Sequence, residues 1–104
     1  VLDRYGYLAG QDRDRAADVN QFFANPQVAA LLPITGGWGS SRILPYLDYD
    51  LIRKNPKIII GFSDITALIL GITARTNLVT FHGPNGFSSW NSEQTAYFRR
   101  MLFA

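Results

Sequence analysis

The chain has 104 residues, which is enough for one modest domain and too few for two. Its 47% hydrophobic and 17% charged residues predict a globular domain, and no apolar run is long enough to span a bilayer. The net charge is +2 and the basic residues are scattered, so we expect no nucleic-acid partner. The absence of cysteine excludes a disulfide framework and a thiolate zinc site, and leaves both the cytosol and an oxidising compartment open.

The first third of the chain predicts a loop, a covering helix and a strand. Residues 1–10 combine tyrosine and glycine without a sustained period, which indicates a loop. Apolar side chains recur at helical spacing over residues 11–24, so we expect an amphipathic helix there. Residues 28–34 form an apolar run, which favours a strand of a parallel sheet that is covered on both faces. Pro33 cannot donate to a ladder and is expected at the end of that strand or on an unpaired side of it.

The remaining elements alternate in the same way, with glycine-containing corners between them. They begin with a glycine corner over 35–41, a short helix over 42–47, a helical turn over 50–53 and a strand over 57–60. A helix from Asp64 to a left-handed cap at Asn77 and a strand over 78–81 follow. The final helix is expected over 92–103, capped by Ser92, with Tyr97, Phe98, Met101 and Leu102 on its apolar side. This alternation predicts an α/β fold with a mainly parallel sheet flanked by helices, a partial Rossmann-like or flavodoxin-like domain. The corners that follow the strands then meet at one edge of the sheet, where such folds bind and react.

Ser63 stands at the corner between a predicted strand and a predicted helix. One interpretation is a nucleophile elbow, in which the serine is exposed on a tight turn and the backbone N–H of Asp64 points to where an oxyanion would form. The other interpretation is that Ser63 only caps the helix, which is the commonest use of serine at such a position. The sequence also departs from the usual elbow, which has a second glycine after the serine.

Two further corners offer candidate groups. Gly36 and Gly37 could supply the other half of an oxyanion hole through a backbone N–H, or could simply form a tight turn. Their spacing does not fit a dinucleotide fingerprint and no Walker lysine follows, so we expect no cofactor. His82 is the only histidine, and its place at a strand end suggests either a general base or a structural residue. Nothing in the spacing of the histidine and the carboxylates predicts a metal site.

Several motifs in the same order resemble the LD-carboxypeptidase family of serine peptidases. These are muramoyltetrapeptide carboxypeptidases, and the family includes the microcin C self-immunity peptidases. The resembling stretches are Tyr7 to Gly10 with Arg15 and Asp18 in the helix that follows, Gly36-Gly-Trp-Gly39, residues 44–53, Pro56-Lys57, residues 61–68 and His82-Gly-Pro84. They cover nearly the whole chain.

The resemblance implies roles for individual residues. Ser63 would be the nucleophile, with the backbone N–H of Asp64 and one from the glycine corner, assigned to Gly37, holding the oxyanion. His82 would match the motif histidine of the nucleophile domain and would line the site together with Gly36 and Trp38. Thr35 stands where many members have an arginine, so we assign no carboxylate-binding role there.

The resemblance also implies that residues 1–104 are a piece of the N-terminal nucleophile domain. The first strand and helix of the family, and the C-terminal domain that supplies its catalytic glutamate and histidine, would lie outside this chain. We therefore expect a chain that is inactive alone, in a parent enzyme that is cytoplasmic and releases the terminal D-alanine of murein tetrapeptide during peptidoglycan recycling. The alternatives are a microcin C-type amidase and a non-catalytic binding remnant. We expect no membrane partner, and a homo-oligomer, a dimer, because a bare sheet edge invites pairing.

Overall fold

A three-stranded parallel sheet forms the middle of the domain, and its strands follow the order β1-β2-β3. The computed structural model describes residues 4–103. The central strand β2 (Ile58–Gly61) pairs with β1 (Ala30–Leu31) on one side and with β3 (Phe81–His82) on the other. The α/β class with a parallel, helix-flanked sheet is therefore confirmed.

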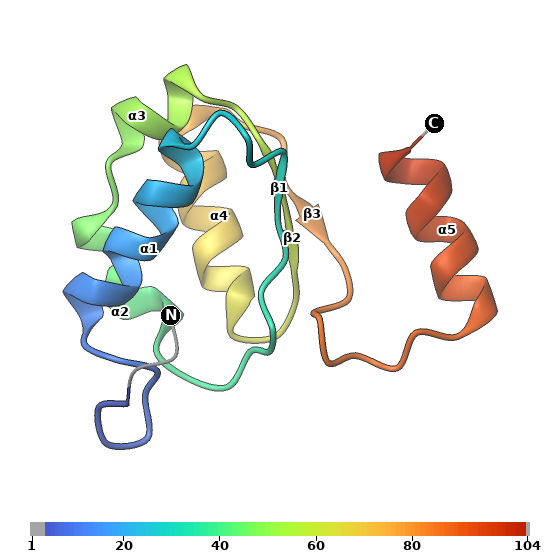
Figure 1. Cartoon of the computed structure of the whole chain (residues 1–104), viewed down its shortest axis with the longest axis horizontal. Helices are drawn as coiled ribbons and strands as arrows, with labels where there is room; N and C mark the ends of the chain where they lie inside the picture. The colour runs from blue at the N-terminus through green and yellow to red at the C-terminus, as the bar shows by residue number, and fades with distance from the viewer. Residues whose placement is uncertain (1–3, 104) are drawn as a thin grey trace.

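Helices cover the sheet unequally. They are α1 (Asp12–Ala24), α2 (Ser40–Ile43), the 3-10 helix η1 (Leu44–Tyr46), α3 (Tyr49–Lys54), α4 (Ile65–Thr76) and α5 (Ser92–Leu102). The first four α-helices lie on one side of the sheet, and α5 stands apart on the other side (Figure 1). None of the helices in the described part of the chain has the length and hydropathy needed to cross a membrane.

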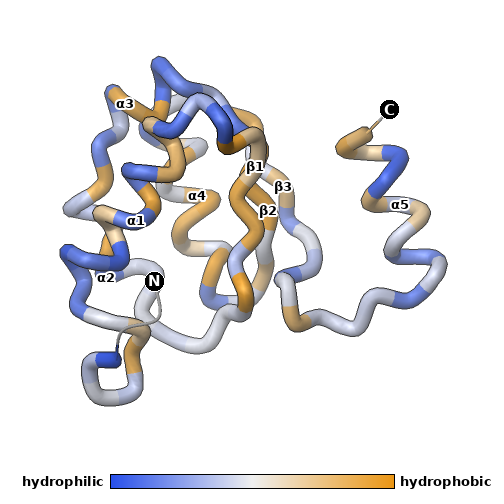
Figure 2. Tube along the Cα trace, in the orientation of Figure 1, coloured by the Kyte–Doolittle hydropathy of each residue, from blue (hydrophilic) through white to orange (hydrophobic). Residues whose placement is uncertain are grey.

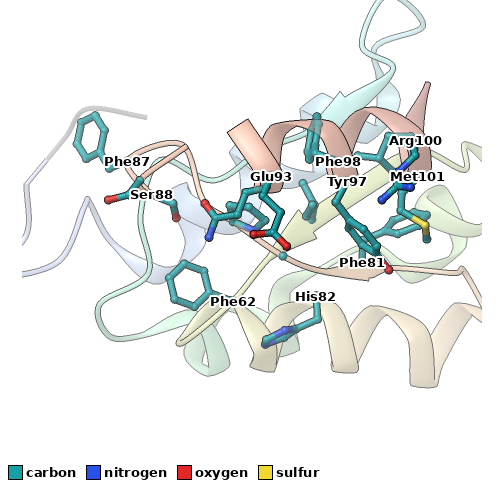
Figure 3. A pocket seen from close by; sticks show the side chains of 16 residues that line it. Phe62, Phe81, His82, Phe87, Ser88, Glu93, Tyr97, Phe98, Arg100 and Met101 are labelled. Atoms are coloured by element: carbon teal, nitrogen blue, oxygen red, sulfur yellow. The ribbon is translucent and has the colours of Figure 1, made fainter. Parts of the chain in front are cut away.

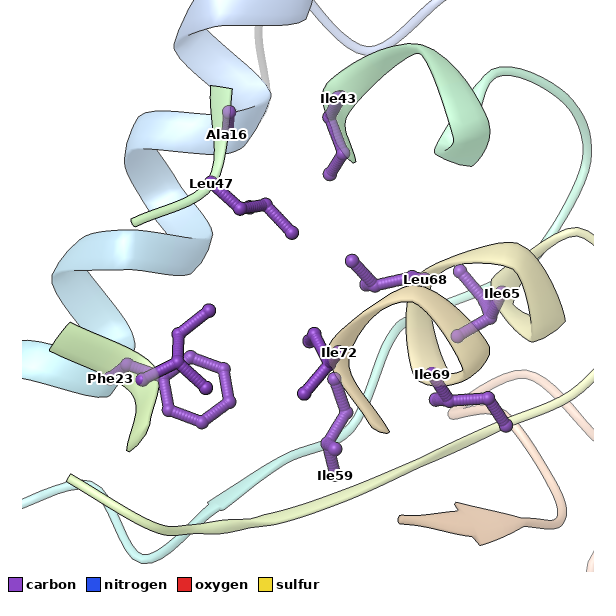
Figure 4. Close-up of a cluster of buried hydrophobic side chains, with 10 residues drawn as sticks. Ala16, Phe23, Ile43, Leu47, Ile59, Ile65, Leu68, Ile69 and Ile72 are labelled. Atoms are coloured by element: carbon purple, nitrogen blue, oxygen red, sulfur yellow. The ribbon is translucent and has the colours of Figure 1, made fainter. Parts of the chain in front are cut away.

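The core lies between β2 and the helices on its covered side. Phe23 of α1, Ile52 of α3, Ile59 of β2 and Ile72 of α4 are fully buried. Figure 4 shows Phe23, Ile59 and Ile72 in this cluster. Burial of side chains of this size stabilises a fold by about 1.5–3 kcal/mol each. The predicted three-and-four spacing of α4 explains its role, since Ile65, Leu68, Ile69 and Ile72 all point into this cluster. Hydrophobic residues accordingly concentrate along β2 and α4 (Figure 2).

The strand predicted over residues 28–34 is much shorter than expected. Only Ala30 and Leu31 pair with β2, and Leu32 and Ile34 are 45% and 52% exposed, so the expectation of cover on both faces was wrong. The carbonyl groups at the end of the run bond to another loop and not to β2. Pro33 O accepts a hydrogen bond from Gly86 N–H and Ile34 O accepts one from Phe87 N–H, both at 2.8 Å. The end of this apolar run is therefore tied to the loop after β3.

Other boundaries differ for local reasons. The helix expected over 42–47 begins earlier, at Ser40, and continues as η1 because Pro45 has no N–H for an α-helical hydrogen bond. The cap of α5 is Asn91 and not Ser92, since the Asn91 side chain accepts a hydrogen bond from Gln94 N–H at 2.8 Å. The left-handed cap predicted at Asn77 is confirmed by its φ of 58°.

The apolar side predicted for α5 does not join the buried core, and it lines an open space between this helix and β3. No residue of this helix is buried, and Tyr97 and Met101 are more than half exposed. Phe98 packs edge-on against Trp90, with ring centroids 5.0 Å apart, so this contact is local to the segment that leads into the helix.

Candidate active site

Ser63 lies on a three-residue connection between the end of β2 at Gly61 and the start of α4 at Ile65. The side chain is exposed, and the backbone φ is +59°, in the left-handed region that residues with a Cβ seldom occupy. That conformation costs about 1–2 kcal/mol. Two turn hydrogen bonds hold it, from Ile65 N–H to Phe62 O and from Thr66 N–H to Ser63 O. The corner is thus a strained, exposed strand-to-helix turn.

The two residues before α4 present backbone N–H groups at this corner. The N-cap residue of α4 is Asp64, and it makes no side-chain cap bond, so the structure does not use Ser63 as the cap. The backbone N–H groups of Ser63 and Asp64 donate to no partner within residues 4–103. Such groups carry the positive end of the helix dipole, which favours a negative oxygen nearby.

The glycine corner packs directly against Ser63. A Cβ built on Gly36 would lie 3.3 Å from Ser63 Cβ and 3.4 Å from both Ser63 Oγ and the Asp64 backbone nitrogen. Gly37 has open space around it but a φ of +100°, which glycine adopts without strain. The backbone N–H of Gly37 also donates to no residue in the range 4–103. These two glycines therefore bring a second set of backbone groups beside the serine.

The Asp64 carboxylate fixes the two corners relative to each other. Asp64 Oδ2 accepts hydrogen bonds from the backbone N–H of Ser40 (2.9 Å) and from Ser40 Oγ (2.7 Å). Ser40 is buried and begins α2 immediately after the glycine corner. Because charge-assisted hydrogen bonds are the stronger class, this pair holds the glycine corner against the Ser63 corner.

The loop after β3, residues 83–88, completes the arrangement. Besides its two bonds to the chain after β1, it contacts the Ser63 corner, where Asn85 Oδ1 accepts a hydrogen bond from Phe62 N–H at 3.3 Å. Gly83 N–H donates to Gly61 O at 3.0 Å and extends the pairing of β2 with β3. The three corners therefore meet at the carboxyl edge of the sheet, as the parallel alternation predicts.

A small pocket of about 190 Å³ lies where they meet. Its lining residues come from all three corners: Thr35, Gly36, Gly37, Phe62, Ser63, Asn85, Phe87 and Ser88. Of the residues predicted for the site, Ser63, Gly36 and Gly37 are brought together here, and Asp64 adjoins them. Trp38 is 68% exposed and does not line this pocket, and His82 does not line it either.

A larger cavity of about 940 Å³ adjoins the small pocket, between β3 and α5. Phe62, Phe87 and Ser88 line both spaces. His82 belongs to the larger cavity, across which Figure 3 shows Glu93, Tyr97 and Arg100 of α5. The wall is mainly aromatic and aliphatic, with one carboxylate and one guanidinium on the α5 side.

A cluster of charged side chains contacts the glycine corner at Gly39. Arg15 donates to the backbone carbonyl of Gly39 at 3.2 Å and pairs with Asp12. Arg42 also pairs with Asp12, its Nε lying 3.0 and 3.1 Å from the two carboxylate oxygens. The hydrogen bond from Arg42, followed by the one from Arg15, holds the pKa of Asp12 below its usual 3.8. Asp12 therefore links α1 and α2 beneath the site.

Asp12→Asn is expected to lower the melting temperature at neutral pH. A carboxyl group whose pKa is depressed by folding stabilises the protein above its unfolded pKa and loses that contribution as the pH falls through the folded value. The difference between wild type and Asp12→Asn should therefore be full at pH 7 and shrink below pH 3.8. Thermal melts from pH 7 to pH 2 test this, with the exposed Asp14→Asn as a control on the same helix turn. A difference that does not change with pH would contradict the assignment.

Two contributors to the site were not predicted from the sequence. Ser40 contacts Asp64 across 24 positions, and Asn85 contacts Phe62 across 23. Neither belongs to a spacing that carries chemistry by itself, and the only local signal was that each sits directly at a glycine- or proline-containing corner. Among the described residues, no group of three histidine, aspartate or glutamate side chains could hold a metal ion.

The chain is similar in sequence and in structure to several known proteins. The microcin C7 self-immunity protein MccF of Escherichia coli is 49% identical over 78 residues, covering 75% of this chain and 23% of that protein. The murein tetrapeptide carboxypeptidase of Pseudomonas aeruginosa is 39% identical over 85 residues, covering 81% of this chain and 27% of that protein. The solved structure of MccF in its wild-type apo state superposes with a TM-score of 0.90 at 38% identity, over 95% of this chain and 31% of that one.

The family description "LD-carboxypeptidase N-terminal domain" matches residues 1–83. The chain belongs to this family, and the resemblance stated from the motifs is confirmed. The chain spans about a quarter of the length of the two curated relatives described above. A muramoyltetrapeptide carboxypeptidase from Oxalobacter formigenes, with a TM-score of 0.87 at 24% identity, shares the fold.

Proposed function

We propose that Ser63 is the nucleophile of a serine carboxypeptidase that releases the terminal D-alanine from murein tetrapeptide in peptidoglycan recycling. One observation carries the proposal: Ser63 is held at a φ of +59° on an exposed corner, against Gly36 and beside the N–H of Asp64, which has no acceptor within residues 4–103. The names of the relatives support the peptidase class and the murein substrate.

The proposed reaction is acyl transfer through Ser63. Its Oγ attacks the carbonyl carbon of the scissile amide, and the backbone N–H groups of Asp64 and Gly37 hold the resulting oxyanion. Collapse of the tetrahedral intermediate forms an ester to Ser63 and expels D-alanine once its nitrogen has taken up a proton. Water then attacks the ester, which regenerates the Ser63 hydroxyl and frees the shortened peptide. Gly36, Trp38, His82 and the adjoining 940 Å³ cavity are assigned to the rest of the peptide.

A base must take the Ser63 proton, because an unassisted serine hydroxyl is a weak nucleophile at neutral pH. The resemblance to LD-carboxypeptidases assigns this role to a histidine and a glutamate in a C-terminal domain outside residues 1–104. His82 is not that base in our proposal, which agrees with its place in the larger cavity and not in the Ser63 pocket. We therefore propose that the isolated chain is inactive and that the full-length protein, which we place in the cytoplasm, is the enzyme.

The test is an assay of the full-length protein on murein tetrapeptide, with release of D-alanine as the readout and the isolated chain in parallel. Ser63-dependent release by the full-length protein supports the proposal. Turnover by the isolated chain that survives Ser63→Ala would contradict both the nucleophile and the need for outside groups.

A second candidate is an amidase of the microcin C type, favoured by the 49% identity to MccF and the TM-score of 0.90. The same serine corner would then cleave a peptidyl-nucleotide analogue. Parallel kinetics on both substrates separate the two, since the true substrate should have the higher kcat/KM. Absence of Ser63 labelling by a fluorophosphonate probe in the full-length protein would instead favour a non-catalytic binding remnant.

The isolated chain is expected to self-associate, most simply as a dimer. Within residues 4–103, β1 pairs only with β2 and β3 only with β2, so both outer edges of the sheet carry unpaired backbone groups. Leu32 and Ile34, which follow β1 in the chain, and Val79, which precedes β3, are exposed. Sedimentation velocity at several concentrations tests this, and a monodisperse monomer throughout would contradict it.

A further inference from the structure

Asn85 is an uncharged polar residue that is almost completely buried at the candidate site. It is 3% exposed and lies in the loop after β3, immediately after Pro84 in the sequence. Buried side-chain amides are normally hydrogen-bonded on both the oxygen and the nitrogen. Its contacts therefore show what the side chain is placed to do.

The contacts fix the orientation of the Asn85 amide. Phe62 N–H is a donor, so the atom that faces it must be the oxygen, Oδ1, at 3.3 Å. The Asn85 backbone N–H donates to Ser88 Oγ at 2.9 Å, and its carbonyl accepts from Ser88 N–H at 3.1 Å. The nitrogen Nδ2 therefore points away from Phe62, and it donates to no acceptor within residues 4–103.

The unpartnered amide belongs to the wall of the Ser63 pocket. Asn85 lines the 190 Å³ pocket together with Ser63, Gly36 and Gly37. Of the other polar side chains in that wall, Ser88 is already engaged by the Asn85 backbone. Nδ2 is thus a donor without an acceptor among residues 4–103, on a side chain that lines the pocket where the scissile group would bind.

We propose that Asn85 binds the substrate, donating from Nδ2 to a carbonyl or carboxylate oxygen of the peptide beside the scissile bond. Its Oδ1 meanwhile holds Phe62 N–H and so positions the residue next to Ser63. This inference rests on the proposed function, because it needs a peptide to enter the Ser63 pocket. It deepens that function by naming a side chain that recognises an oxygen acceptor there.

Asn85→Asp in the full-length protein separates the two roles of the side chain. The carboxylate keeps an oxygen for Phe62 N–H but replaces the donor by a second acceptor. We expect kcat/KM for murein tetrapeptide to fall by about 10- to 100-fold, mainly through KM. The substrate oxygen would lose its hydrogen-bond donor and would face a carboxylate oxygen instead. Labelling of Ser63 by a small fluorophosphonate should stay within about threefold of wild type, because the corner is intact. Asn55→Asp, at the opposite end of β2, is the matched control and should change neither.

A wild-type kcat/KM for Asn85→Asp would overturn the proposal. An equal loss of labelling and hydrolysis would also overturn it, since that result assigns Asn85 to support of the corner alone. If Asn85→Asp does not fold, NMR decides: in the Ser63→Ala protein, saturating murein tetrapeptide should shift the Asn85 side-chain amide protons, and an unshifted signal overturns the proposal. Failure of the proposed function is distinct, because the wild-type protein would then show no Ser63-dependent hydrolysis while the same titration still tests Asn85.

Discussion

Ser63→Ala in the full-length protein is expected to reduce release of D-alanine from murein tetrapeptide by about 10³- to 10⁶-fold, the range seen when a serine nucleophile is removed. The loss should appear in kcat, because the change removes the attacking oxygen and leaves the lining of the pocket in place. Labelling by a fluorophosphonate probe should disappear in the same variant. Retained hydrolysis at more than about a tenth of the wild-type rate would show that Ser63 is not the nucleophile.

Stability gives the control for this result. Alanine has the same Cβ as serine and must occupy the same left-handed φ of +59°, so Ser63→Ala should melt close to wild type. Ser63→Gly relieves the strain and should be more stable than Ser63→Ala by about 1 kcal/mol, after the greater freedom of glycine in the unfolded chain is subtracted. A strained serine that is less stable than its glycine variant is the expected mark of a position selected for chemistry.

The meeting of the three corners could be predicted because it depends on topology. Alternating apolar runs and helices require a parallel sheet, and in such a sheet the chain leaves every strand at the same edge. Gly36 and Ser63, which are 27 positions apart, could therefore be placed together without a structure. The left-handed cap at Asn77 and the inward stripe of α4 were predictable for a similar reason, since each depends on local spacing and residue type.

The supporting contacts could not be predicted, because they depend on where side chains lie after the elements have packed. The Ser40 to Asp64 bonds join the starts of two helices, and the Phe62 to Asn85 bond joins a corner to a loop. Any serine or asparagine in those loops would have looked equally suitable. The length predicted for the strand at residues 28–34 was wrong for a related reason. Apolar composition does not show how many residues pair with β2.

The second large effect is expected at Gly36. Gly36→Ala in the full-length protein should lower kcat on murein tetrapeptide by about 10²- to 10³-fold, the usual loss when an oxyanion donor is disabled. The reason is steric: the new methyl group would lie 3.4 Å from both Ser63 Oγ and the Asp64 backbone nitrogen, where our proposal places the oxyanion. Its cost to folding should be modest, because Gly36 has no positive φ and the contacts of 3.3–3.4 Å with Ser63 and Asp64 require only small shifts of the exposed corner.

Gly37→Ala provides the contrast, since the two glycines differ in what their Cβ would meet. At Gly37 a methyl has no atom within 4 Å, but the φ of +100° is strained for any residue with a Cβ. Gly37→Ala should therefore destabilise the protein by about 1–2 kcal/mol. Gly36→Ala, by comparison, should fold normally and fail in turnover and in fluorophosphonate labelling. Equal activity of Gly36→Ala and wild type would mean that the oxyanion does not bind at the Asp64 N–H beside Gly36, and the reacting carbonyl would have to lie on another side of Ser63.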